Sequence, residues 1–179
     1  MSKEEAKRDR EIADLVIRTY LSQYDLREKL DNKLHNFVTI TGTIATLSIG
    51  IALFVFDKIS MSNPYHNHLV VTFLIYLILF VGALIIGLRG YKPTKYTWYP
   101  NDSVKLIEEY RKLPTERQVI RKAIGSYAKA ANLNKDINAQ KSQTCNKVFW
   151  LFILGILVMT IFSFFMILAL GVPPPAVDP

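Results

Sequence analysis

The stretch Leu30–Phe56, LDNKLHNFVTITGTIATLSIGIALFVF, decides the fold of this 179-residue chain. It opens as a charged, helix-forming segment and passes into apolar sequence without a break. Its second part, Asn36–Phe56, has 21 residues and no Lys, Arg, Asp or Glu. At a helical rise of about 1.5 Å per residue, such a segment crosses a hydrocarbon core of about 30 Å. We therefore expect the first of several membrane spans here.

When the residues are placed at 100° each, this span has one polar face and one face of small residues. One face is polar along the whole helix, with His35 and Phe54 at its edges. Its members are Asn32, Asn36, Thr39, Thr43, Thr46, Gly50 and Asp57. The far side carries the small residues Thr41, Ala45, Ser48 and Ala52. Small side chains let helix backbones approach closely in lipid, so this second face is suited to packing.

The polar face has two interpretations. In the first, several copies surround a pore that this face lines, with Phe37 or Phe54 as an apolar constriction that gates by dewetting. We expect a homo-oligomer, with a tetramer favoured, because one polar helix per subunit cannot enclose a pore without several copies. In the second, the hydroxyls donate to the carbonyls four residues earlier and the face is only a contact between helices.

Apolar residues are concentrated in three blocks, Asn36–Phe56, His68–Leu88 and Val148–Leu170. Each is long enough to span a bilayer and contains no charged residue. The sequence therefore predicts an all-α integral membrane protein with three transmembrane helices. The third block is bulky, as expected for contact with lipid. Its phenylalanines are Phe149, Phe152, Phe162, Phe164 and Phe165.

The basic residues of the loops predict the orientation in the membrane. Residues 89–147 carry 13 Lys and Arg against 5 Asp and Glu, and residues 1–34 carry 8 of each. The loop 57–67 has Lys58 alone, and the tail 171–179 has no basic residue. We expect residues 1–35 and 89–147 in the cytoplasm and the carboxyl terminus outside an inner (plasma) membrane. The charged amino terminus does not resemble a cleavable signal peptide and is expected to stay in the mature protein.

Two segments of the chain predict long cytoplasmic helices that continue into spans. Residues 1–34 contain no Gly or Pro and alternate in charge, so one helix should run from about residue 10 into the membrane. A short helix is expected over Asn101–Lys112. Thr115 should cap a further helix, and no proline occurs from Glu116 to Leu170. Its stretch Lys129–Lys147 is polar on almost every side and therefore needs neighbouring helices.

Two groups of residues are candidates for a ligand site. Arg89–Pro100 combines aromatic and basic residues, which is typical of an interfacial belt but also of a site where bases stack and cations meet phosphates. The Lys and Arg of the later helix either line a pocket for an anionic ligand or form a solvated face. The candidates are Arg89, Lys92, Lys95, Trp98, Lys129, Lys135 and Lys141.

Nothing in the sequence indicates catalysis. There is no nucleophile with a base partner, no phosphate-binding glycine loop and no suitable pair of carboxylates, so we do not expect an enzyme, a cofactor or binding to genomic DNA. His66 and His68 lack accompanying Cys or acidic residues, and an exposed interfacial pair is favoured over a metal site. Cys145, the one cysteine, is expected to be a reduced thiol.

Several short motifs resemble a family. They are Leu30-Asp31-Asn32-Lys33 before the first span, Gly42-Thr43 within it, and Asn134, Asn138 and Lys141 before the last span. The chain is similar, over about residues 20 to 165, to small membrane effectors of nucleotide-signalled anti-phage defence systems, of the SLATT, Pycsar and Hailong types. The resemblance implies an oligomer controlled by a nucleotide or oligonucleotide from a partner nucleotidyltransferase. It also implies that activation depolarises the inner membrane. The alternative is a membrane-anchored module without a conduit, whose cytoplasmic helices bind a protein partner.

Overall fold

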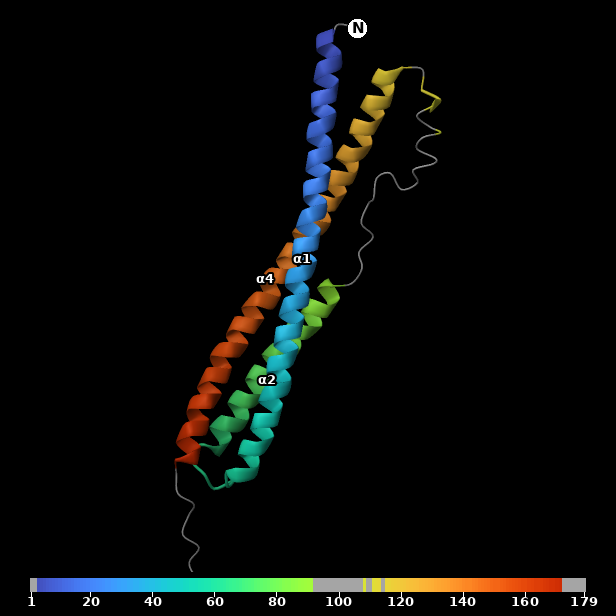
Figure 1. Ribbon diagram of the computed structural model, residues 1–179. Coiled ribbons are helices and arrows are strands. Elements are labelled where there is room, and N and C mark those ends of the chain that lie inside the picture. Colours follow the sequence, from blue (N-terminus) through green and yellow to red (C-terminus); the bar gives the residue numbers. More distant parts are fainter. Residues whose placement is uncertain (1–2, 92–107, 109–110, 114, 172–179) are drawn as a thin grey trace, which may run out of the picture. The chain divides into compact units, whose positions relative to one another are not determined.

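The computed structural model describes residues 3–91, 108, 111–113 and 115–171. Among the described residues are three long helices, α1 (Lys3–Lys58), α2 (His66–Gly90) and α4 (Glu116–Leu170) (Figure 1). Each contains a segment long and apolar enough to cross a membrane. The all-helical fold is thus confirmed. Most of the helix expected over Asn101–Lys112, and nearly all of the tail, lie outside the described residues.

Helix α1 runs without interruption from Lys3 to Lys58. Glu4 and Glu5 lie in its first turn and Lys58 in its last, where their charges complement the helix dipole. The continuous helix expected from the sequence is confirmed, and it begins earlier than the expected start near residue 10.

Side-chain hydrogen bonds mark the starts of the other two helices. The Thr115 hydroxyl accepts from the backbone N–H of Gln118 at 3.4 Å, so Thr115 caps α4 as the sequence predicts. Before α2, Asn63 Oδ1 accepts from the N–H of Tyr65 at 2.9 Å, and Asn63 Nδ2 donates to the carbonyl of Ala169 at 3.0 Å. Asn63 therefore holds the turn before α2 against the end of α4.

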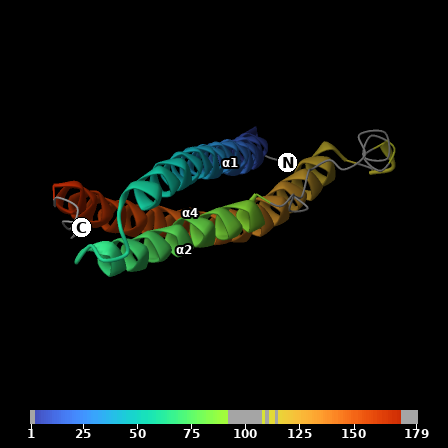
Figure 2. The same cartoon turned by 90° about the horizontal axis from the view of Figure 1, so that it is seen from below.

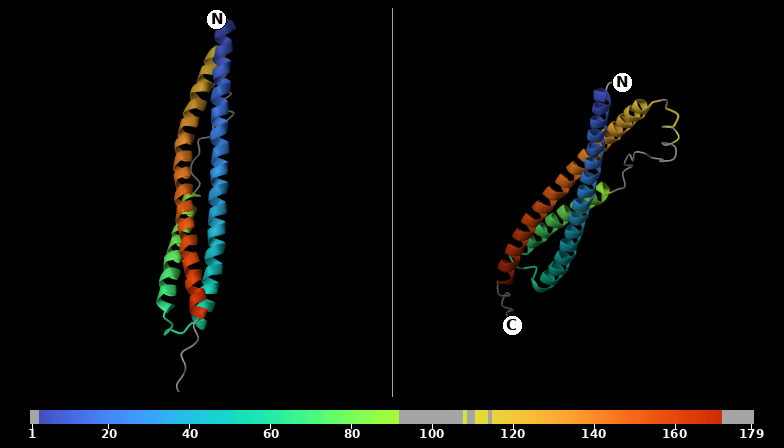
Figure 3. Two further views of the ribbon diagram at one scale, coloured as in Figure 1. Left: turned by 90° about the vertical axis from the view of Figure 1, so that its left-hand side faces the viewer. Right: turned by 45° about the horizontal axis from the view of Figure 1, so that its top comes forward.

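The chain forms two compact units, and both α1 and α4 contribute to each. The first unit comprises the described residues of Met1–Asn32 and Pro93–Ser142, and the second those of Lys33–Lys92 and Gln143–Pro179. In the first unit, contacts pair Asp9 with Arg117, Tyr20 with Tyr127 and Asp31 with Lys141. Both partners advance together along the sequence, so the two helices are parallel there (Figure 3).

The second unit is a bundle of α1, α2 and α4, with a short connection from α1 to α2 (Figure 2). Aromatic rings from all three helices meet in its core. Tyr76 of α2 lies 5.9 Å from Phe80 and 5.5 Å from Phe162 of α4 between ring centroids, and Phe56 of α1 lies 5.7 Å from Phe73. Phe162 is almost fully buried, so the expectation that it contacts lipid is wrong. Phe164 is largely exposed.

The small face of α1 packs in this core. Thr41 and Ala52 are completely buried, and Ala45 and Ser48 nearly so. The predicted packing role of these four residues is therefore confirmed. Close approach between the other two helices depends on Gly155 of α4, where an added Cβ would lie 2.5 Å from Cε1 of the buried Phe80 ring.

We predict that Gly155→Ala destabilises the protein relative to Gly125→Ala. The overpacking at Phe80 should cost about 1–3 kcal/mol, whereas an added Cβ at the exposed Gly125 has no atom within 4 Å. Both changes gain about 1 kcal/mol of helix propensity, so the comparison isolates the clash. Thermal unfolding of the detergent-purified chain, followed by circular dichroism, measures the difference. Equal stability of the two variants would contradict the packing described here.

Candidate functional site

The polar face of α1 is exposed on the surface of the chain. All seven residues predicted to line a conduit are exposed: Asn32, Asn36, Thr39, Thr43, Thr46, Gly50 and Asp57. The reason is the packing of the small face, which fixes the rotation of α1 about its own axis. An added Cβ at Gly50 would meet nothing within 4 Å, so the helix is open to a close neighbour there.

The hydroxyls of this face are also bonded within their own helix. Thr43 Oγ1 donates to the carbonyl of Thr39 at 3.0 Å, and Thr46 Oγ1 donates to that of Gly42 at 2.9 Å. The back-bonding of the second interpretation is therefore present. The face is nevertheless not a contact between the helices of one protomer. Each bonded hydroxyl oxygen keeps lone pairs that can accept from water or from a partner.

A shallow groove runs along the same face between Val38 and Leu47. Val38, Thr39, Gly42, Thr43, Thr46 and Leu47 of α1 border it, together with Leu84 of α2. Its wall is mixed and combines three threonine hydroxyls with aliphatic side chains.

The two candidate gate residues differ in their surroundings. Phe37 packs inside the protomer, with its ring centroid 6.0 Å from that of Phe149 and 6.2 Å from that of Phe152. Phe54 has 67% of its surface exposed. Of the two, Phe54 is therefore the one that a neighbouring molecule can reach.

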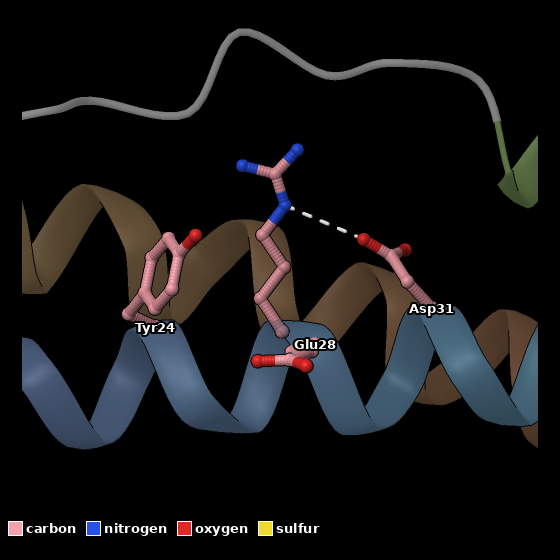
Figure 4. Close-up of a pocket in the computed structure, with 4 residues that line it drawn as sticks. Tyr24, Glu28 and Asp31 are labelled. Atoms are coloured by element: carbon pink, nitrogen blue, oxygen red, sulfur yellow. Dashed lines mark ion pairs between the residues drawn. The ribbon is translucent and has the colours of Figure 1, made fainter.

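A second polar feature lies in the first unit and is buried. Asn138 Nδ2 donates to the carbonyl of Gln23 at 2.8 Å and to Gln23 Oε1 at 3.0 Å. Lys141 Nζ donates to Asp31 Oδ1, and Arg27 Nε lies 3.4 Å from Asp31 Oδ2. We call Gln23, Arg27, Asp31, Asn138 and Lys141 the polar cluster. Beside it, Tyr24, Arg27, Glu28 and Asp31 border a hollow on α1 (Figure 4).

The charge of Lys141 dominates the energetics of the polar cluster, because only 5% of this residue is exposed. A buried ammonium loses its hydration and needs a close counter-charge, which Asp31 supplies. Asn134, one turn before Asn138, is fully buried as well. The motif residues Asp31, Asn138 and Lys141, far apart in sequence, thus meet in one place, and their pairing fixes how α1 and α4 align in this unit.

The ligand candidates do not form one site in the described residues. Lys141 was expected in a row of cations, but it is buried against Asp31. Lys129 and Lys135 are exposed, and at 100° per residue these three lysines lie on three different sides of α4. Arg89 is exposed in the last turn of α2, in the other unit. Lys92, Lys95 and Trp98 lie outside the described residues.

Ion pairs that the sequence did not predict join the start of α1 to the start of α4 in the first unit. Asp9 Oδ2 lies 3.0 Å from Arg117 Nε and 3.6 Å from Arg121 Nε, and Arg10 Nη2 donates to Glu116 Oε1 at 3.0 Å. The two members of each ion pair are more than 100 residues apart in the sequence, so no local pattern could predict these pairs.

His66 and His68 contact different aromatic rings. His66 lies 6.1 Å from Phe56, and His68 stacks on Phe165 at 5.1 Å between ring centroids. Across the described part of the chain there is no group of three or more His, Cys, Asp or Glu placed to hold a metal ion. Cys145 is buried and forms no disulfide.

No protein-family model, curated protein or solved structure matches this chain. The candidate sites are therefore characterised by their geometry alone.

We predict that Asp31→Ala destabilises the protein far more than Lys141→Met. The first change leaves the Lys141 charge buried and unpaired, at a cost of about 3–5 kcal/mol. The second removes that charge and leaves Asp31 with Arg27. The double variant Asp31→Leu/Lys141→Met should regain most of the loss. Chemical unfolding of the purified protein measures these differences.

The exposed pair Lys7–Glu11, with nitrogen and oxygen 3.9 Å apart, provides the control. Lys7→Met should change the stability by less than about 1 kcal/mol. If Asp31→Ala proved no worse than Lys141→Met, the buried pair would not have the energetic role assigned here.

Proposed function

We propose that this protein is an oligomeric membrane effector that forms a gated ion channel or pore. Its three apolar helical segments span the bilayer, and the exposed polar face of α1 lines the conduit. The residues in contact with water are Asn36, Thr39, Thr43, Thr46 and Gly50, with Asn32 and Asp57 at the two ends. A tetramer is favoured, with the copies arranged around a common axis.

The observation that supports this proposal is the direction of the polar face. The seven polar-face residues are exposed, while the small residues on the far side of α1 are buried in the protomer. Large aliphatic side chains cover the other exposed surfaces of the second unit, among them Ile78, Ile85, Leu157 and Ile167. Lipid suits those surfaces, whereas a band of hydroxyls ending in Asp57 suits water.

The proposed topology follows the distribution of basic residues. Residues 1–35 and 89–147, which carry most of the Lys and Arg, lie in the cytoplasm, and the loop 57–67 lies outside. In this arrangement the polar cluster is cytoplasmic and the gate candidate Phe54 is near the outer end of the conduit.

The resemblance of the short motifs supplies the biological part of the proposal. A nucleotide-derived signal from a partner nucleotidyltransferase controls the pore, and opening depolarises the inner membrane during anti-phage defence. The protein itself carries out no reaction in this scheme. A passive pathway needs none of the ionisable groups inside the spans that a pump uses.

The alternative is a membrane-anchored interaction module without a conduit. One observation favours it: Thr43 and Thr46 already donate to carbonyls of their own helix, so a dry contact leaves these donors satisfied. In that case the two threonines pack against another helix, and bulky substitutions at them disturb assembly without any change in ion flux.

Single-channel recording in planar bilayers tests the proposal. Thr43→Leu should lower the conductance, because an aliphatic side chain narrows and dewets the conduit. Phe54→Ala should raise the current at rest if this ring forms the constriction. Thr160→Leu is the matched control, since Thr160 is an exposed threonine of α4 with the same bond to the carbonyl four residues earlier, at 3.0 Å.

The control should conduct like the wild type. Silence of the purified wild type, with and without a panel of cyclic and linear nucleotides, would count decisively against a pore. Equal effects of Thr43→Leu and Thr160→Leu on the conductance would show that α1 does not line the conduit.

A further inference from the structure

A second exposed stripe lies on α1 within the first unit. It consists of Ile12, Leu15, Thr19, Ser22 and Leu26, and we call it the seam. Its residues follow one another at intervals of three, four, three and four, the spacing of residues that meet a neighbouring helix in a coiled coil. Leu15 has 65% of its surface exposed, and Ile12 and Leu26 are exposed as well.

The seam is separate from the surface that meets α4. That surface includes Asp9 and Tyr20, which are mostly buried. At 100° per residue, the seam is centred roughly a third of a turn away from them. On the remaining side of α1 lie charged residues such as Arg18 and Asp25. The first half of α1 therefore has one side against α4, one charged side, and an apolar seam between them.

The seam needs a protein partner because the first unit lies outside the apolar segments, where no acyl chains can cover it. The unit also has a small core of its own. Its buried apolar residues in the described part are Tyr20, Leu30, Ala130 and Ala131. Two helices with so few buried side chains are marginal in water, because helical stability comes chiefly from tertiary packing of an apolar face.

We propose that the seam is the surface on which the same seam of a second copy docks, in parallel. The inference rests on the proposed oligomer and adds to it a cytoplasmic assembly surface. Copies inserted in one membrane with one topology present α1 in the same direction, so the same residues of each copy lie at the same height.

The sequence register and the hydroxyl bonds favour a second copy of this chain as the partner. Leu15 and Ser22 precede Asn36, Thr43 and Gly50 by whole multiples of seven residues, the repeat that keeps one side of a helix toward its neighbour in a left-handed supercoil. Lys29 lies seven residues after Ser22 and seven before Asn36, and its charge ends the seam.

The polar members of the seam can be buried in an interface without losing the hydrogen bonds that their hydroxyls donate. Thr19 Oγ1 donates to the carbonyl of Leu15 at 2.9 Å, and Ser22 Oγ donates to that of Thr19 at 2.8 Å. With their donors satisfied, Thr19 and Ser22 act as small residues between the larger Ile12, Leu15 and Leu26. That alternation suits close packing of two identical helices.

Disulfide cross-linking in native membranes tests the proposal on the full-length chain with Cys145→Ala. Leu15→Cys and Ser22→Cys should each give a band at twice the protomer mass of 20.5 kDa after mild oxidation. Leu21→Cys is the matched control, because Leu21 is a leucine of the same helix, 52% exposed, on another side. It should stay monomeric.

A second measurement guards against cross-links from chance collisions. Leu15→Glu should shift the mass of the detergent-purified particle toward the protomer, whereas Leu21→Glu should not. Helix content by circular dichroism shows that each variant is folded.

A third variant, Gly50→Cys, separates the two proposals. Cross-linking at Gly50 but not at Leu15 or Ser22 would overturn the seam and leave the oligomeric pore standing. No cross-link at any of the three positions would overturn both.

Discussion

The close packing of the small face of α1 is the constraint on which the second unit depends. Thr41, Ala45, Ser48 and Ala52 allow α1 to approach its neighbours, and Gly155 does the same between α4 and Phe80 of α2. Once this side of α1 is buried, the rotation of the helix about its own axis is fixed. Every residue of the polar face must then be outside the protomer. The exposure of that face is a consequence of packing and needs no separate cause.

The polar cluster has the corresponding role in the first unit. Few apolar side chains are buried there, and hydrogen bonds and charges determine the alignment instead. Lys141 cannot leave Asp31 without exposing an unpaired charge to a dry environment, so sliding of α4 along α1 meets a barrier. Buried polar pairs are best attested as devices that fix register, which is the role that this geometry supports.

The sequence predicted the helices well and their partners poorly. The absence of proline predicted the continuous helices. The spacing of the hydroxyl residues predicted that α1 has a polar face and a separate small face. The positions of Phe162 and Lys141 were not predictable in this way. A phenylalanine in an apolar block is equally suited to lipid and to a core, and a lysine in a polar helix is equally suited to water and to a buried carboxylate. The choice depends on contacts such as Lys141 with Asp31, which are 110 residues apart.

The proposed conduit requires that the polar face of α1 meet water within the membrane, and the accessibility of engineered cysteines measures this contact. Thr43→Cys, Thr46→Cys and Thr160→Cys, each with Cys145→Ala, would be reacted with a membrane-impermeant thiol reagent in sealed vesicles. Only a hydrated cysteine reacts, because the thiolate is the reactive form. We expect fast labelling at positions 43 and 46 and protection at 160. Protection at all three positions would contradict this expectation.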